Sequence, residues 1–348
     1  MRRCLNLSAS IVGRLLPAAG LAVAVGLVVV TPSLVGMSWA AVGAVIAGVS
    51  VTTLVALSAL WILGLLVHTM VLTAALPGLS SGRALLLNLS GSAVSNLVPF
   101  GGAAGMAWGY VMTRAWKVPP TSFAAFTVIS NVWNVIGKLL VGTVLLGGAL
   151  FLGATIPPGL HGILVVGSMT VVALLVAVFT IALSARAAAR VGRALDNVLN
   201  RILRAAGSTR VVAFEQWVAQ ARTETSTTIG ASWGRLTAGV AAYLFLQWLL
   251  LAACLLAVGA HVSLLVVAVA FGIERLLTLV PFTPGGSGFA ELGTVAILVA
   301  LGGAPVVVAG GVLLYRFYSH LMEIPVGGAG GLVWMHWHRR TLRKAALA

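Results

Sequence analysis

The chain has 348 residues, of which 60% are hydrophobic and only 8% are charged. Ordinary soluble domains carry about 25% charged residues, so this composition excludes a soluble globular protein and indicates a polytopic helical membrane protein. The net charge of +15 could suggest nucleic-acid binding, but membrane topology explains it better, and we expect no nucleic-acid partner. Cys4 lies near the basic N-terminus and Cys254 lies in an apolar run, so we expect no disulfide.

Two apolar runs open the chain. Residues 15–30 follow a basic N-terminus and form either a signal peptide, cleaved near Ser38-Trp39-Ala40, or a membrane segment. Residues 39–76 exceed the ~20 residues that one crossing needs. We predict a single long, tilted helix for this second run.

The next two apolar pieces, residues 84–98 and 101–113, are separated by Pro99 and the pair Gly101-Gly102. Each piece is too short to cross a bilayer comfortably, whereas a broken helix at membrane depth is tolerated when protein surrounds it. We therefore predict a re-entrant hairpin that enters and leaves on one side. A long helix over residues 119–153 follows.

A predicted span at residues 163–184 is followed by a more polar, arginine-rich linker at residues 186–235. Four arginines share one helical face of this linker: Arg190, Arg193, Arg201 and Arg204. The pattern indicates an interfacial amphipathic helix attracted to anionic lipid of the inner leaflet, although a solvated helical linker explains it equally well. A second polar-apolar helix at residues 215–224 returns the chain to the membrane, which residues 236–259 cross.

A second broken segment, VPFTPGGSGFAELG, occupies residues 280–293. Proline removes a backbone donor and glycine tolerates strained dihedral angles, so the helix must break here. The breaking residues and the three charges that flank them are Pro281, Pro284, Gly285, Gly286, Glu274, Arg275 and Glu291. Charges within the membrane are costly enough to indicate function. The upstream stretch NLVPFGGAAGMAWG, residues 96–109, is similar, so we interpret the two segments as the centres of related halves. A last span is predicted at residues 305–334.

Basic residues predict the orientation. If both termini are cytoplasmic, 18 of the 21 Lys and Arg residues lie on the cytoplasmic side, and Lys138, Arg275 and Arg316 lie within membrane segments. The two hairpins then open from opposite sides, as in transporters built from inverted repeats. We predict an all-α, multi-pass protein of a bacterial cell membrane with about six transmembrane helices plus two re-entrant helical hairpins. The single integral membrane domain (1–348) comprises repeat one (about 39–153), the linker (about 186–235) and repeat two (about 236–335).

The long helix after each hairpin supports this pairing of halves. Polar residues share one face at spacings of three and four: Asn131, Asn134 and Lys138 in the first helix, and Arg316, His320 and Glu323 in the second. Counted from each motif, Asn131 corresponds to Arg316, and Lys138 to Glu323. Because an unpaired charge at membrane depth is costly, we predict that Lys138 and Glu323 approach each other.

These features converge on a candidate anion site. The half-helices that begin at Gly101 and Pro284 expose N–H groups and the positive end of a helix dipole. Arg275 and Arg316 add donors suited to phosphate, and the glutamates could balance them or meet a cationic headgroup. Alternatively, the charged residues pair with one another and only hold the bundle together. The substrate-binding candidates are Gly101, Gly102, Asn131, Lys138, Arg275, Pro284, Gly285, Gly286, Glu291, Arg316 and Glu323.

Enzyme motifs are missing from the sequence. It contains neither a GxxxxGK[ST] phosphate loop nor HExxH nor a Ser-centred elbow, and it has only six acidic residues. We therefore expect no cofactor, no metal site and no enzymatic activity. An enzyme would have to build its site from Glu274, Glu291 and Glu323.

Four stretches resemble the lysylphosphatidylglycerol synthase transmembrane-region family, the flippase-like membrane domain of the multiple peptide resistance factors, and its actinobacterial-type branch in particular. They are VPFGGAAGMAWGYVMTRAW, ISNVWNVIGKLL, ERLLTLVPFTPGGSGFAELG and LLYRFYSHLMEIPVGG, within residues 84–335. The resemblance implies two re-entrant hairpins and the handling of lipid headgroups, and it matches Arg275, Glu291 and Arg316 to the family's second-half motif. The first half departs, because Ala104-Gly105 and Asn131 stand where many members carry Gly-Glu and Arg. The soluble synthase domain is not present in these residues, so lipid synthesis is not implied.

We therefore predict a lipid translocase or lipid transport protein for an anionic phospholipid or a polyprenyl-phosphate-linked lipid. The alternatives are a membrane enzyme, or enzyme subunit, of envelope lipid metabolism and a structural or regulatory membrane partner. The expected partners are membrane lipid, anionic inner-leaflet lipid at the basic linker, and either a second copy of the chain or envelope-lipid enzymes.

Overall fold

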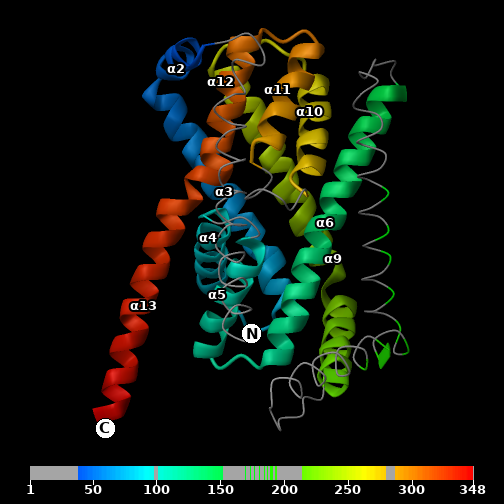
Figure 1. The fold of residues 1–348 in the computed structure, drawn as a ribbon, viewed down its shortest axis with the longest axis vertical. Coiled ribbons are helices and arrows are strands. Elements are labelled where there is room, and N and C mark those ends of the chain that lie inside the picture. The colour runs from blue at the N-terminus through cyan, green and yellow to red at the C-terminus, as the bar shows by residue number, and fades with distance from the viewer. Residues whose placement is uncertain are drawn as a thin grey trace, which may run out of the picture.

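The computed structural model describes residues 38–97, 101–151, 214–279 and 287–347, together with isolated positions between residues 169 and 193. Within these ranges every regular element is a helix (Figure 1). Three stretches are long and apolar enough to cross a membrane: Val51–Ala75, Pro120–Leu145 and Ala219–Ala257. These observations confirm an all-α membrane protein. The predicted segment at residues 15–30, the span at 163–184 and most of the basic linker lie outside the described residues.

The first half contains α2 (Trp39–Ala47), α3 (Val51–Ala75), α4 (Ser81–Leu97), α5 (Gly101–Ala115) and α6 (Pro120–Phe151). The second half contains α9 (Phe214–Ala257), α10 (Leu264–Leu277), α11 (Phe289–Ala300), α12 (Pro305–Arg316), the π-helical turn η2 (Phe317–Leu321) and α13 (Glu323–Leu347). The helices of both predicted hairpins, α4–α5 and α10–α11, are therefore present. That they are re-entrant stays a prediction.

The prediction of one long helix over residues 39–76 is wrong. The run contains two helices, α2 and α3, because Gly48 ends the first and Ser50 caps the second. The Ser50 hydroxyl accepts a hydrogen bond from the Thr53 backbone N–H at 3.2 Å, which satisfies a donor that the helix start leaves free. As a result α2 turns away from α3 and packs against α12.

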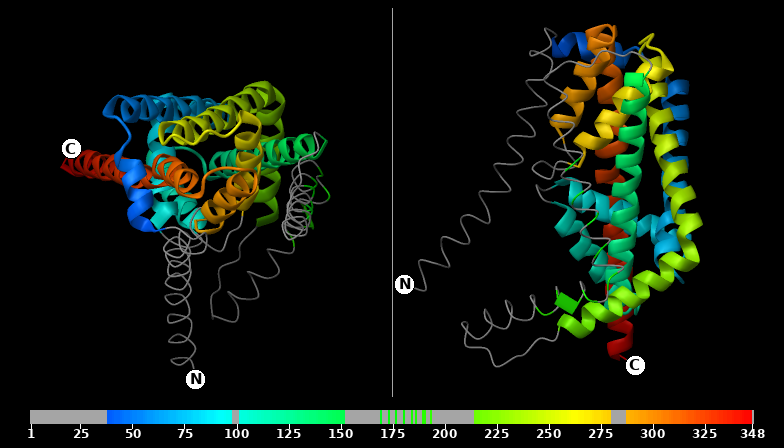
Figure 2. Two further views of the ribbon diagram at one scale, coloured as in Figure 1. Left: turned by 90° about the horizontal axis from the view of Figure 1, so that it is seen from above. Right: turned by 90° about the vertical axis from the view of Figure 1, so that its right-hand side faces the viewer.

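Two further predicted boundaries are corrected. The helix at residues 215–224 and the span at 236–259 form one continuous helix, α9, because residues 214–257 contain no proline. Figure 2 shows that the first part of this helix runs at an angle to the rest of it. The last span is interrupted by η2, in which the Met322 N–H donates to the Phe317 carbonyl at 2.7 Å. Such π-helical turns frequently occur at functional sites.

The two hairpins occupy opposite halves of the molecule along its long axis (Figure 1). The first helix of each hairpin packs against the last part of the other half: α4 against α13, and α10 against α6. The helices that precede the hairpins, α3 and α9, pack against each other. This reciprocal packing is the pattern that two inverted repeats produce.

Equivalent glycines lie at these two reciprocal contacts. Gly142 of α6 lies eleven residues after Asn131, and Gly327 of α13 lies eleven residues after Arg316. A Cβ atom on Gly142 would lie 3.0 Å from the Gly272 carbonyl oxygen, and one on Gly327 would collide with the Leu89 carbonyl. The missing side chains let the helix backbones approach closely, as small residues do in membrane helix pairs.

The two ends of the molecule differ in charge. The α5–α6 connection and the C-terminal end of α13 lie at one end, and both carry basic residues, including Lys117 and Arg340 (Figure 1). At the other end, the described connections at residues 48–50, 258–263 and 301–304 contain no Lys or Arg. This asymmetry agrees with the predicted topology. Which end is cytoplasmic stays a prediction.

Candidate functional site

Four charged side chains meet inside the second half. Glu274 and Arg275 lie in the last turn of α10, Glu291 in the first turn of α11, and Arg316 at the end of α12. Their exposed fractions are only 1%, 6%, 5% and 8%, respectively. The end of α10, the start of α11 and the end of α12 therefore meet near the break between α10 and α11, and this brings the four charges together.

The four charges alternate in sign. Glu274 forms an ion pair with Arg275 and lies 3.5 Å from the Arg316 Nη1 atom. Arg316 Nε in turn donates to Glu291 Oε1 at 2.7 Å. Two positive and two negative side chains thus compensate one another, which buried ionic groups need in order to be tolerated. These contacts agree with the alternative that the charged residues pair with one another and hold the bundle together. That alternative does not account for the cavity that two of them also line.

Glu291 also caps the helix in which it lies. Its Oε2 atom accepts a hydrogen bond from the Gly288 backbone N–H at 2.6 Å. Gly288 has a φ of 87°, in the left-handed region that favours glycine, so the chain turns sharply into α11 there. The predicted helix N-terminus at Pro284 is corrected, because α11 begins at Phe289 and a carboxylate of the protein already occupies this donor. Pro284, Gly285 and Gly286 lie outside the described residues.

Arg275 is enclosed by protein. Its Nη2 atom donates to the Tyr315 hydroxyl at 2.7 Å, and its guanidinium lies 4.8 Å from the centre of the Phe271 ring. The Tyr315 hydroxyl continues the network to Gln247 at 3.4 Å. The structure therefore gives Arg275 and Arg316 different surroundings, although Glu274 links them.

Arg316 and Glu291 line a cavity of about 590 Å³. Ser287 and His320 complete its polar end: Arg316 Nη2 donates to Ser287 Oγ at 3.3 Å, and Ser287 Oγ lies 3.3 Å from His320 Nε2. The rest of the described wall is apolar and comes from Trp39, Ile46, Leu54, Leu313, Leu314, Phe317 and Leu321. We call this space the charged cavity. It has one polar end and long apolar walls.

Sequence reasoning missed part of this lining. Ser287 lies inside the broken motif and could have been included on that ground. The contribution of Trp39 and Ile46 had no local signal, because it depends on α2 turning back onto α12.

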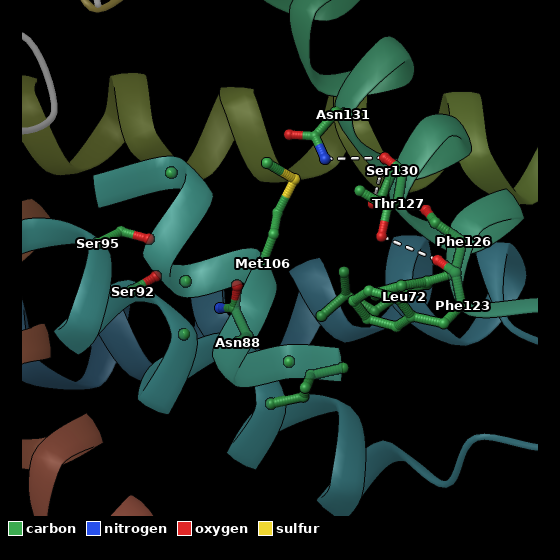
Figure 3. Close-up of a pocket in the computed structure, with 15 residues that line it drawn as sticks. Leu72, Asn88, Ser92, Ser95, Met106, Phe123, Phe126, Thr127, Ser130 and Asn131 are labelled. Atoms are coloured by element: carbon green, nitrogen blue, oxygen red, sulfur yellow. Dashed lines mark hydrogen bonds between the residues drawn. The ribbon is translucent and has the colours of Figure 1, made fainter. Parts of the chain in front are cut away.

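The first half has a cavity of its own, of about 210 Å³, between α4, α5 and α6 (Figure 3). Gly102 and Asn131, two of the predicted substrate-binding residues, line this neutral cavity, and that they bind substrate stays a prediction. Gly101 does not line it, because the Cα of Gly101 packs against the backbone of Ser95.

Lys138 and Glu323 have separate partners. Lys138 Nζ donates to Thr278 Oγ1 at 3.3 Å, whereas Glu323 Oε2 accepts from Asn96 Nδ2 at 3.5 Å. No ion pair joins them among the described residues. The prediction that they approach each other is wrong, because each reaches the hairpin of the opposite half.

Comparison with known families gave one match. The model described as "Lysylphosphatidylglycerol synthase TM region" matches residues 18–327, which include both hairpins and the charged cavity. The comparisons with curated proteins and with solved structures gave no match. Among the described residues there is also no group of three or more His, Cys, Asp or Glu side chains placed to hold a metal ion.

Proposed function

Since the chain belongs to the lysylphosphatidylglycerol synthase transmembrane-region family and has a membrane-lipid-related function, we propose that it binds and translocates a lipid whose headgroup contains phosphate. The lipid is an anionic phospholipid or a polyprenyl-phosphate-linked lipid. The proposal includes no bond-making step, because the carboxylates of Glu274 and Glu291 are held by arginines.

The observation that carries this proposal is the lining of the charged cavity. One end presents Arg316, Ser287 and His320, which can donate hydrogen bonds to phosphate oxygens. The remaining wall is apolar and suits hydrocarbon chains. A lipid has the same division between a polar head and apolar chains.

The contacts of Arg316 suggest how a phosphate enters without leaving a charge unpaired. In the structure Glu291 neutralises Arg316, and Glu291 keeps a second bond to the Gly288 N–H. We infer that lipid phosphate takes the place of Glu291 beside Arg316, while the carboxylate stays on the helix N-terminus, where a negative charge is favourable. Arg316 then has an anionic partner both with and without lipid.

The reciprocal packing of the halves supports translocation over static binding. Two hairpins in opposite halves, each held against the last helix of the other half, provide the arrangement in which one repeat can move against the other around a central site.

The test is lipid binding and transfer by the purified full chain. Phosphatidylglycerol and a polyprenyl phosphate are offered, retained lipid is counted by native mass spectrometry, and transfer is followed in vesicles. Arg316→Gln is expected to reduce both by tenfold or more, since a charge-assisted hydrogen bond contributes roughly 1.5–3 kcal/mol.

Loss of folding must be separated from loss of binding. The double variant Arg316→Gln with Glu291→Gln keeps the cavity neutral, so it is expected to fold and still lose lipid. Arg340→Gln removes an exposed cation at the end of α13 and serves as the matched control. Normal lipid retention and transfer in a folded double variant would reject the proposal. It would indicate that Arg316 and Glu291 have a purely structural role.

A further inference from the structure

We propose that the neutral cavity of the first half is a second binding site, selective for an uncharged polyol such as a glycerol or sugar group. This proposal depends on the proposed function only in one respect, namely that the polyol group is part of a lipid. Its residues differ from those of the charged cavity, so the two sites can be tested separately.

The polar side chains that line the cavity, beside its apolar residues, are all uncharged. Three polar side chains come from α4 and three from α6: Asn88, Ser92, Ser95, Thr127, Ser130 and Asn131. Among the residues described around this cavity, none is Lys, Arg, Asp, Glu or His. The equivalent position to Arg316 is Asn131, so the first half offers an amide where the second half offers a guanidinium.

The α6 side of the cavity presents mainly acceptors. The donors of Thr127 and Ser130 are bound to backbone carbonyls of their own helix, at 2.8 and 2.7 Å, and the Asn131 amide nitrogen donates to the Thr127 carbonyl at 2.8 Å. Their side-chain oxygens remain as acceptors, and Figure 3 shows the Asn131 amide oxygen pointing away from α6. The oxygens of an ionised phosphodiester only accept hydrogen bonds, so this wall disfavours such a phosphate and favours O–H groups.

The α4 side supplies groups that both donate and accept. Figure 3 shows the Ser92 and Ser95 hydroxyls pointing from α4 toward α5, near Asn88. Hydroxyl and amide groups can give and take hydrogen bonds, which is the property that polyol hydroxyls share. The Ser92 hydroxyl donates to the carboxylate of Glu323, which does not line the cavity, so Asn88 and Ser95 are the α4 groups that can both donate and accept there. That carboxylate further disfavours an anion, while the donors on α4 disfavour an ammonium group.

The cavity has room because α5 contributes glycines. A Cβ atom on Gly105 would collide with the Ser95 hydroxyl, so that position packs α5 against α4. A Cβ atom on Gly102 would meet no described atom within 4 Å, so that position opens into space. The volume of about 210 Å³ is several times the ~30 Å³ of one liquid water and admits a group of glycerol to sugar size.

The experiment compares headgroups on identical acyl chains. The full chain is incubated with equimolar phosphatidylglycerol, phosphatidic acid and phosphatidylethanolamine, and native mass spectrometry gives the ratio of retained lipids. Phosphatidylglycerol and phosphatidic acid share a phosphate but differ in the polyol. We expect phosphatidylglycerol to be favoured over both others by about tenfold, the effect of one to two neutral hydrogen bonds.

Two variants address the site by different means. Asn131→Leu removes an acceptor, and Gly102→Leu fills the space while keeping every polar group; each is expected to bring the ratio of phosphatidylglycerol to phosphatidic acid close to one. Gly82→Leu, at an exposed glycine of α4 whose Cβ position is also open among the described atoms, is the matched control and is expected to keep the ratio. Monodispersity in size-exclusion chromatography shows that the variants are folded.

The outcomes separate the two sites. Arg316→Gln is expected to lower the total lipid retained without changing the ratio, so the proposed function and the polyol site fail independently. Competition by methyl glucoside identifies a soluble polyol as the source, and a lack of competition identifies a lipid-borne one. A ratio near one in the unmodified chain, an unchanged ratio in both variants, or a preference for phosphatidylethanolamine would overturn the polyol site.

Discussion

The Lys138 ammonium donates a hydrogen bond to the Thr278 hydroxyl at 3.3 Å, and this contact has a counterpart in the other half. Asn96 holds the place of Thr278 in the upstream motif, and its amide lies 3.5 Å from the carboxylate of Glu323. Lys138 and Glu323 are themselves equivalent, each seven residues after Asn131 or Arg316. Each half therefore places a charged side chain on the polar residue that precedes the Leu-Val-Pro-Phe sequence of the other half.

The contact between Lys138 and Thr278 can be measured by a double-mutant cycle. Thr278→Val is expected to lower the free energy of unfolding by about 1–3 kcal/mol, because the half-buried ammonium of Lys138 loses an acceptor. With Lys138→Met already present, the same change should cost much less, since no charge remains to be satisfied. Thermal unfolding of the detergent-purified chain gives the four values.

Thr113→Val is the control for that cycle. Thr113 is buried and its hydroxyl donates to carbonyls of its own helix, as the Thr278 hydroxyl also does. Its substitution should cost the same in the presence and absence of Lys138. Equal costs for Thr278→Val in both backgrounds would show that Lys138 depends on some other group.

A pair of neighbouring glycines tests the packing between the halves. Gly327→Ala is expected to destabilise the protein by about 1–3 kcal/mol, because the added methyl meets the Leu89 carbonyl and α13 must move away from α4. Gly328→Ala adds the same methyl where no described atom lies within 4 Å, so it is expected to be neutral or to stabilise the helix by up to about 1 kcal/mol. Melting temperatures of the two variants decide this, and equal destabilisation by both would argue against close packing at Gly327.

Substitutions of Arg275 and Arg316 are expected to have different effects on stability and on lipid binding. Arg275→Ala leaves the Tyr315 hydroxyl and Glu274 without their main donor, so it should destabilise the fold by roughly 3–5 kcal/mol. Lipid retained per folded molecule should fall less than in the Arg316 variants, because Arg275 does not line the charged cavity. Arg275→Lys is expected to restore stability only in part, since the planar fork is lost. Normal melting of Arg275→Ala with strong loss of lipid would reverse this assignment.

The topology prediction is tested by single-cysteine labelling of intact cells, in a background with Cys4 and Cys254 replaced. Ser263→Cys, between α9 and α10, is expected to react with an impermeant reagent. Thr341→Cys near the C-terminus and Gly207→Cys in the basic linker are expected to react only after the membrane is permeabilised. Strong labelling of position 207 in intact cells would contradict the orientation and the inverted arrangement with it.

The fold class and the two breaks in the helices could be predicted from the residues alone. Long apolar runs can only be helices in a membrane, since the backbone must satisfy its own hydrogen bonds there. The chain breaks between α4 and α5 and between α10 and α11, in stretches that contain proline. Proline acts on its own backbone, so both breaks could be predicted locally, although the start of α11 at Phe289 was not. The correspondence between Asn131 and Arg316 also followed from counting along the chain.

Which charges meet, and which of them face a cavity, depends on how the helices pack together. Sequence spacing placed Arg275 and Arg316 near one break, but the side chain of Tyr315 encloses the first, and α2 builds the cavity wall beside the second. Lys138 and Glu323 carry opposite charges at equivalent positions, yet their partners come from whichever hairpin packs against each helix. Contacts between residues far apart in the chain depend on the packing of whole helices, and no local pattern of residues encodes that packing.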